Sequence, residues 1–301
     1  MSSITKVALA GAKGNLGEVV LAQLLDAGFQ VTALTRQGGS QTFPSNVTVK
    51  AVDYDSLDSL TSALQGQDAV VATLGSFALD KQFLLIDAAA KAGVKRFIPS
   101  EFGSNTLHER TSKLPGYKLK VDVRKALEKA ASESGLTWTV VVNGPFLDWG
   151  ISAGFLLNAK DRTIELPDGG NNKFSASTLS TVAKGVVGVL KNPDQTKNRG
   201  VYVQDAVLTL KQLEGIVQKL VGADGWKETV PSIEEGLQQG LEEIKKEQPN
   251  MLTVFLTTLK AAIYGGDAYG CQFHKNDNEL FGIKELSDAE VEAVVAKSIP
   301  K

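Results

Sequence analysis

A lysine stands on the apolar side of an amphipathic helical pattern near the middle of the chain. The stretch GYKLKVDVRKALEKAASESG, residues 116–135, has helical spacing. On a helical wheel, Leu127 lies within about 20° of Lys120. Four residues lie within about 40° of the opposite pole and form the polar stripe: Lys118, Asp122, Lys125 and Lys129. Because a buried ammonium needs partners or a lowered pKa, Lys120 requires either a contact or a chemical role.

Two kinds of chemistry suit a lysine in this position. As an ammonium, Lys120 would donate a hydrogen bond or a proton to an oxyanion that develops while hydride arrives. As a neutral amine, it would act as a base in ether or enol chemistry. Tyr117 is the rival acid, and we predict Lys120 as the principal catalytic group with Tyr117 secondary. The structural alternative is a lysine that snorkels to water at the helix end or pairs with Glu101.

A glycine-rich turn near the N-terminus has the spacing of a dinucleotide-binding loop. Gly11, Gly14 and Gly17 form G-x-x-G-x-x-G between a buried strand pattern and an amphipathic helix pattern. In such a loop the glycines permit a tight turn, a close approach to a pyrophosphate, and close packing of helix on strand. The helix N-terminus also attracts phosphate. We predict dinucleotide binding here rather than a merely structural turn. The predicted cofactor contacts also include Asn15 and Leu16, which lie between Gly14 and Gly17.

The end of the second strand pattern, ALTRQGGS, indicates which dinucleotide binds. Arg36 stands where an NAD-selective site usually has an acidic residue. A guanidinium can hold a 2'-phosphate bidentately, so we predict NADPH; the alternative is a solvated charge at a strand end. Further predicted cofactor contacts are Asp53, Tyr54, Thr73, Leu74, Gly75, Gln82, Lys120, Pro145 and Phe146. Asp53 is equally suited to a cap or turn, and Gln82 to a solvent-facing position.

An aromatic-rich segment, NGPFLDWGISAGF, follows the sixth strand pattern. Aromatic walls suit a flat phenolic substrate. For any single residue, a hydrophobic seam inside the protein is the alternative interpretation. The predicted substrate contacts are Phe102, Phe146, Leu147, Trp149 and Phe155.

The scaffold for these residues follows from the alternation of patterns. Six strand patterns that are apolar on both faces alternate with amphipathic helices in the first half, which predicts an α/β fold with a doubly wound parallel (Rossmann) sheet. Beyond about Gly150 helices dominate. We predict an NADP-binding domain at residues 1–150 and a smaller, mostly helical substrate-binding cap at residues 151–301, interlocked with it. Helices are expected there at residues 178–190, 209–220, 233–246, 251–264 and 287–297.

Composition narrows the class of protein. A net charge of −2 argues against nucleic acid or an anionic membrane as a partner. Two histidines and one cysteine are too few for a zinc cluster, so we predict no metal. No apolar run reaches the roughly 20 residues needed to span a bilayer. The N-terminal pattern lacks a secretory signal, and a single cysteine suits a reducing cytosol, so we expect a cytoplasmic monomer or homodimer.

Four motifs together carry a family resemblance: GAKGNLG, the strand end LTR, FIPSEFG and YKLKVDVRKALE. They resemble the NmrA-like branch of the atypical short-chain dehydrogenases, and within it the isoflavone reductase-like enzymes, including fungal relatives. The resemblance covers essentially the whole chain and is strongest over residues 6–150. It implies NADPH-dependent reduction of an aromatic secondary metabolite such as an isoflavone, a phenylpropanoid ether or a lignan. It also implies that Lys120 is the catalytic or nicotinamide-orienting lysine, with Arg124 and Tyr117 matching its usual companions.

Three functions compete at this point. The first is an NADPH-dependent reductase of an aromatic or conjugated small molecule. The second is a non-catalytic NADP(H)-binding redox sensor of NmrA type that binds a protein partner. The third is epimerase-like or lyase chemistry with no net consumption of NADPH. Lys120 on the apolar stripe favours the enzyme, because a sensor needs no reactive group there.

Overall fold

A seven-stranded sheet is the largest sheet of the computed structural model, which describes residues 3–39 and 41–300. The strand order is β3-β2-β1-β4-β5-β6-β9, and the ladders from β3 to β6 are parallel. The strands are β1 (Lys6–Ala10), β2 (Gln30–Arg36), β3 (Thr48–Val52), β4 (Ala69–Ala72), β5 (Arg96–Ile98), β6 (Thr137–Val142) and β9 (Arg199–Tyr202). From β1 the chain first adds β2 and β3 on one side and then β4, β5 and β6 on the other. The predicted doubly wound α/β sheet is therefore confirmed.

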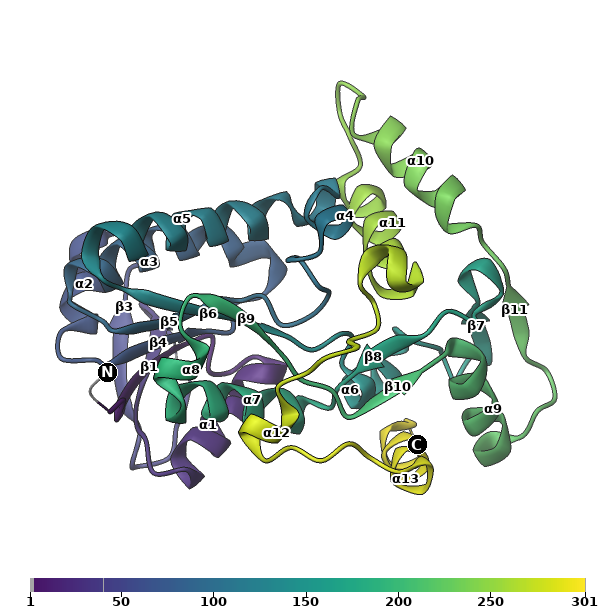
Figure 1. Ribbon diagram of the computed structural model, residues 1–301, viewed down its shortest axis with the longest axis horizontal. Coiled ribbons are helices and arrows are strands. Elements are labelled where there is room, and N and C mark those ends of the chain that lie inside the picture. Colours follow the sequence, from purple (N-terminus) through teal and green to yellow (C-terminus); the bar gives the residue numbers. More distant parts are fainter. Residues whose placement is uncertain (1–2, 40, 301) are drawn as a thin grey trace. The chain divides into compact units, whose positions relative to one another are not determined.

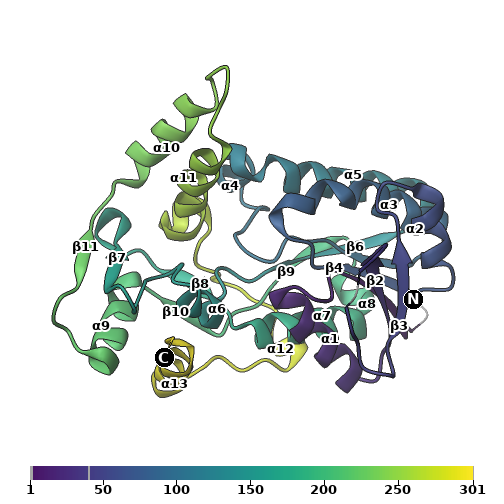
Figure 2. The same cartoon turned by 180° about the vertical axis from the view of Figure 1, so that it is seen from behind.

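Helices cover both faces of this sheet (Figures 1 and 2). On one face lie α2 (Leu57–Leu64), α3 (Gln82–Lys91) and α5 (Lys118–Ser134); on the other lie α1 (Asn15–Asp26) and α7 (Leu179–Lys191). A short helix, α8 (Pro193–Thr196), and a 3-10 turn, η1 (Ser76–Lys81), complete these connections. The inner strands are mostly buried on both sides, and all four residues of β4 are inaccessible to solvent, whereas the edge strand β3 is mostly exposed.

The described chain divides into two compact units. The first contains the residues up to Phe102, Leu119–Val141 and Val182–Val201; the second contains Gly103–Lys118, Val142–Thr181 and the residues from Tyr202 onward. The sequence-based prediction of a single boundary near residue 150 differs from this division. The physical reason is that α7 and β9 come after that boundary in the sequence but belong mostly to the unit of the sheet.

The second unit is mostly helical, as predicted. Its two small sheets pair β8 (Phe174–Ala176) with β10 (Ala206–Leu208) and β7 (Thr163–Glu165) with β11 (Lys227–Thr229). Three of these strands escaped the sequence analysis, because a three-residue strand is too short to show alternation. Its helical segments are α4 (Glu109–Ser112), η2 (Pro115–Tyr117), α6 (Leu147–Ser152), η3 (Pro167–Gly169), α9 (Leu210–Val221), α10 (Ile233–Glu243), α11 (Met251–Tyr264), η4 (Gly266–Tyr269), α12 (Asn278–Phe281) and α13 (Asp288–Ser298).

Across residues 3–39 and 41–300, no helix combines the length and the apolar character that crossing a membrane requires.

Candidate active site

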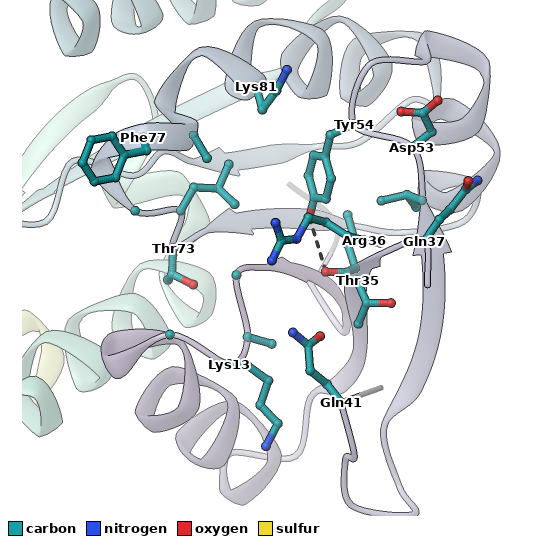
Figure 3. A pocket seen from close by; sticks show the side chains of 18 of the residues that line it. Lys13, Thr35, Arg36, Gln37, Gln41, Asp53, Tyr54, Thr73, Phe77 and Lys81 are labelled. Atoms are coloured by element: carbon teal, nitrogen blue, oxygen red, sulfur yellow. Dashed lines mark hydrogen bonds between the residues drawn. The ribbon is translucent and has the colours of Figure 1, made fainter. Parts of the chain in front are cut away.

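A cavity of about 700 Å³ opens at the carboxyl ends of β1, β2, β3 and β4 (Figure 3). This volume is within the range of small-molecule and cofactor sites. In doubly wound sheets, ligands bind at this edge, where the strand order reverses. Eight of the predicted cofactor contacts line the cavity: Gly11, Gly14, Arg36, Asp53, Tyr54, Thr73, Leu74 and Gly75. The order β2-β1-β4 places the reversal at β1, directly beneath the glycine loop.

The glycine loop turns tightly between β1 and α1. Gly11 has a φ of +83°, and a Cβ atom there would lie 2.4 Å from the carbonyl oxygen of Thr73. A Cβ atom on Gly17 would lie 2.0 Å from the carbonyl oxygen of Gly11, so this glycine packs the helix onto the loop and does not line the cavity. Gly14 is the N-cap of α1 and has no side chain to cover the helix amides. These positions therefore fit a cradle for phosphate groups.

The first turn of α1 contributes to this cradle through its backbone. Asn15 and Leu16 open the helix, and the Leu16 side chain is buried in the core. Neither side chain lines the cavity. Their predicted contact with the cofactor is therefore restricted to their backbone amides, which point out of a helix N-terminus.

Arg36 and Tyr54 lie side by side among the residues that line the cavity, and the Arg36 guanidinium extends into it (Figure 3). The Tyr54 hydroxyl donates a hydrogen bond of 3.3 Å to the carbonyl oxygen of Leu34. Burial raises the pKa of Tyr54 to about 12, against the opposing effect of the Arg36 charge. Asp53 lines the cavity and also accepts a 2.9 Å hydrogen bond from the backbone N–H of Asp55, so both of its predicted roles are compatible with the structure.

Several cavity residues were missed by sequence reasoning: Lys13, Gln37, Gln41, Phe43, Asp55, Phe77 and Lys81. Lys13 lies inside the glycine motif, with its Nζ 5.2 Å from the centre of the Phe43 ring. Its position inside the glycine motif is the sequence feature that could have identified Lys13 as a cavity residue. Lys81 and Asp55 form an ion pair of 2.6 Å between η1 and the loop after β3. No sequence pattern pairs these two residues, because only the folded sheet brings their loops together.

Gln82 does not line the cavity, which contradicts its predicted role as a direct cofactor contact. Its side chain is 1% exposed. The Oε1 atom accepts a 2.8 Å hydrogen bond from the backbone N–H of Ser100, and Nε2 donates a 3.2 Å hydrogen bond to the carbonyl oxygen of Leu79. The amide is therefore used within the protein, and its solvent-facing alternative is wrong as well.

Lys120 lies in the first turn of α5, and its side chain is only partly accessible to solvent. Its Nζ donates a hydrogen bond to the backbone carbonyl oxygen of Glu101, in the loop after β5. Burial lowers the pKa of Lys120, and the Glu101 charge opposes this effect. Leu127 is buried, whereas Lys125 on the opposite stripe is exposed. The predicted orientation of the helix is thus confirmed. Lys120 does not line the cavity described above.

Tyr117 is buried at the start of the Lys120 helix. It ends η2, is 3% exposed and packs in the core of the second unit. Its hydroxyl donates a 2.7 Å hydrogen bond to the Ser104 hydroxyl, which is also buried. This geometry favours a packing role for Tyr117, which leaves Lys120 as the better candidate.

The aromatic-rich segment after β6 surrounds α6 in the second unit, and we call its rings of Phe146, Trp149 and Phe155 the aromatic edge. Phe146 and Trp149 meet edge to face with ring centres 6.3 Å apart, and Trp149 lies 6.4 Å from Phe155. Leu147 is fully buried in the core of this unit, so its predicted contact with substrate is wrong; it faces inward from the first turn of α6. Pro145 lines a separate cavity of about 10 Å³, together with Ser104 and other residues of this unit. Neither Pro145 nor Phe146 lines the large cavity.

Neither histidine lines the large cavity. His274 forms an exposed pair of 2.9 Å with Asp267, and His108 is the N-cap residue of α4. Within the part of the chain that the structure describes, no three His, Cys, Asp or Glu side chains gather in a metal-binding arrangement.

The sheet order and the glycine turn at its edge together define a protein with a Rossmann-type fold. The profile of the NmrA-like family matches residues 3–268, and the chain belongs to this family. The resemblance stated from the sequence motifs is therefore confirmed.

Named relatives extend over nearly the whole chain. Oxidoreductase aprR of Aspergillus flavus is 34% identical over 300 residues, covering 97% of this chain and 99% of the relative. Isoflavone reductase homolog IRL of Zea mays is 29% identical and covers 89% of each chain.

Solved structures share the fold. The structure of AtPrR2 with NADP+ and (+)pinoresinol has a TM-score of 0.78 at 21% identity and covers 99% of this chain and all of the other. Leucoanthocyanidin reductase from Vitis vinifera in complex with NADPH has a TM-score of 0.76 at 19% identity, with coverage of 98% and 100%.

Proposed function

We propose that this chain is an NADPH-dependent reductase of an aromatic or conjugated small molecule, similar to an isoflavone or phenylpropanoid or to a fungal secondary metabolite. The observation that carries the proposal is the cavity of about 700 Å³ built on the glycine loop, with Arg36 at its edge. Membership of the NmrA-like family supports it, as do relatives named oxidoreductase and isoflavone reductase homolog. We also propose a cytoplasmic location, because a single cysteine suits a reducing compartment.

The first unit supplies the groups that would hold NADPH. The backbone around Gly11 and Gly14 would bind the pyrophosphate, because no side chain obstructs its approach. Arg36 would bind the 2'-phosphate, and Tyr54 would form the apolar wall beside it. The bound cofactor supplies a hydride equivalent to the substrate.

Lys120 is the group that we assign to proton handling. Its lowered pKa increases the fraction of neutral amine at a given pH, so Lys120 is closer to exchanging a proton near neutrality than an ordinary lysine. The Glu101 carbonyl holds its Nζ in place. From there the ammonium would donate a hydrogen bond or proton to an oxygen that gains negative charge, as in general acid catalysis. Tyr117 is assigned a supporting role only.

The aromatic edge in the second unit supports the proposed substrate class. The rings of Phe146, Trp149 and Phe155 form a continuous series, and Phe155 is partly exposed. Such rings bind a flat conjugated molecule by offset or edge-to-face contact. Phe102 stays a predicted substrate contact of the first unit.

The test is NADPH consumption with a panel of quinones, enones and phenylpropanoids, followed at 340 nm. We expect turnover with at least one member, and Lys120→Ala is expected to keep its affinity for NADPH while losing at least about a hundredfold in kcat. Lys125→Ala is the matched control, because Lys125 lies on the exposed stripe of the same helix with a side chain that is 69% exposed. Near-normal turnover of Lys120→Ala would refute the catalytic assignment.

The second candidate function is a redox sensor that binds NADP(H) and a protein partner. Exposed apolar residues at neighbouring ends of α10 and α11 favour it: Leu241, Ile244, Met251, Leu252 and Leu256. A sensor would consume no NADPH with any member of the panel. It would instead retain a protein partner in a pull-down whose yield depends on whether NADP+ or NADPH is present.

A further inference from the structure

The loop that follows β5 contains a tight turn at residues 99–102. The backbone N–H of Glu101 donates a 2.8 Å hydrogen bond to the carbonyl oxygen of Pro99, which closes a turn of only three residues. The next residue, Phe102, has a φ of +24°, in the region that favours glycine. A non-glycine residue is held in such a conformation only when its surroundings determine it strongly. The turn therefore depends on contacts from outside itself.

Gln82 provides such a contact at the start of α3. Its Oε1 accepts the Ser100 N–H at 2.8 Å, while its Nε2 is anchored 3.2 Å from the Leu79 carbonyl oxygen. The Ser100 hydroxyl in turn accepts a 2.8 Å hydrogen bond from the backbone N–H of Leu74, a cavity residue. Gln82 and Ser100 are both buried, so water does not replace these bonds readily.

Lys120 contacts the same turn from α5. Its Nζ donates to the carbonyl oxygen of Glu101, the residue that follows Ser100. Both α3 and α5 lie on one face of the sheet (Figure 1). The charged and titratable groups around this amine are the Glu101 carboxylate, which favours the ammonium, and Arg124, one helical turn further along α5.

We infer that Gln82 is a positioning residue for Lys120, because its buried amide holds the strained turn whose Glu101 carbonyl receives the Lys120 Nζ. This inference rests on the proposed function, in which Lys120 handles the proton. Without the Gln82 acceptor, the Ser100 N–H is left unpaired in a buried place and the turn relaxes. The Glu101 carbonyl then moves away from Lys120, and the ammonium loses the acceptor that stabilises its charged form.

Competitive labelling with acetic anhydride tests this inference without a substrate. The rate at which Lys120 is acetylated, read by peptide mass spectrometry from pH 6 to 11, reports its fraction of neutral amine. For Gln82→Met we expect the half-maximal pH of Lys120 to fall by about 1 relative to the wild type, the scale of one hydrogen bond to a charged group. Gln82→Glu keeps an acceptor for the Ser100 N–H and is expected to prevent that fall.

Two further variants separate positioning from loss of stability. Gln82→Asn is the milder change, since it withdraws the acceptor by about one C–C bond length of 1.5 Å, and the fall is expected there too. Asn278→Leu is the matched control, because Asn278 is a buried amide of the second unit that bonds to both backbone groups of Gln204. It is expected to lower Tm and to leave the Lys120 profile unchanged.

The outcomes distinguish the inference from the proposed function. If Gln82→Met and Gln82→Asn lower Tm as Asn278→Leu does, yet leave the labelling profile of Lys120 as in the wild type, Gln82 is merely structural and the inference is overturned. If the labelling shift is present but Lys120→Ala retains turnover, the positioning is correct and the catalytic assignment fails. If the shift is accompanied by a fall in kcat at unchanged affinity for NADP+, both stand.

Discussion

Arg36 is the residue from which we predict cofactor selectivity most directly. Replacing it with leucine removes the guanidinium that extends into the cavity at the end of β2 (Figure 3). Tyr54 beside it keeps its own hydrogen bond to the Leu34 carbonyl oxygen, so the wall of the cavity stays in place. The substitution should therefore weaken binding of the dinucleotide that carries a 2'-phosphate and spare the one that lacks it.

The size of the effect follows from the exposure of Arg36. Hydrogen bonds to charged groups contribute about 1.5–3 kcal/mol each. The Arg36 side chain is exposed, so solvent and salt screen its charge and the lower part of that range applies, about 1.5–2 kcal/mol. At 1.4 kcal/mol for each factor of ten, Arg36→Leu should raise the Kd for NADP+ by about 10- to 30-fold. The Kd for NAD+ should stay within about twofold of the wild type.

Isothermal titration of both dinucleotides into wild type and variant measures this selectivity. Lys91→Leu is the control for net charge, because Lys91 is an exposed lysine at the end of α3 that pairs with Asp58. Raising the salt concentration should reduce the preference of the wild type for NADP+ more than that of Arg36→Leu. An equal loss of affinity for both dinucleotides, or no loss for NADP+, would refute the assignment of the 2'-phosphate to Arg36.

Three further variants test the site and its scaffold. Gly17→Ala should lower the free energy of unfolding by about 2 kcal/mol or more, because its Cβ would lie 2.0 Å from a loop carbonyl oxygen. The Cβ of Gly215→Ala meets open space in α9, so this control should raise the free energy of unfolding by about 0.5–1 kcal/mol in the same denaturation assay. Tyr117→Phe removes the hydrogen bond to Ser104 and should cost about 1 kcal/mol, with kcat on the best substrate of the panel within about threefold of wild type; a hundredfold loss would restore Tyr117 as the acid. Lys120→Met should raise Tm at neutral pH, because the folded state lowers the pKa of Lys120 and so disfavours its ammonium. The gain in Tm should shrink as the pH rises toward the ordinary lysine pKa. A gain that grows with pH would contradict the lowered pKa.

The first unit was largely predictable from local patterns. Apolar strands and amphipathic helices alternate up to β6, as predicted. Ser56 also caps α2 locally, because its hydroxyl accepts a hydrogen bond from the backbone N–H of Ser59. Gly11, Gly14 and Arg36, which the sequence patterns singled out, also line one cavity. These predictions succeeded because each depends on a few consecutive residues and on the rule that parallel strands end at one edge of the sheet.

Contacts between distant segments were not predictable in the same way. Leu147 and Trp149 belong to one aromatic-rich segment, yet their surroundings differ. Leu147 is buried in the core, whereas Trp149 is partly exposed and its ring contacts that of Phe146. Gln82 was expected at the cofactor, and its amide is instead held by Ser100, eighteen residues away. Spacing along the chain does not record which groups a side chain meets across the sheet.

The sequence by itself determined that the chain builds a parallel sheet, that a tight glycine loop follows its first strand, and that Lys120 faces inward from its helix. Those properties follow from periodicity and backbone stereochemistry, which are local. Only the tertiary structure decided that β9 completes the sheet and that the Glu101 carbonyl receives the Lys120 amine. It also decided that burial outweighs the Glu101 charge in setting the pKa of that amine. Desolvation depends on everything packed around a group, and no single stretch of the sequence contains that environment.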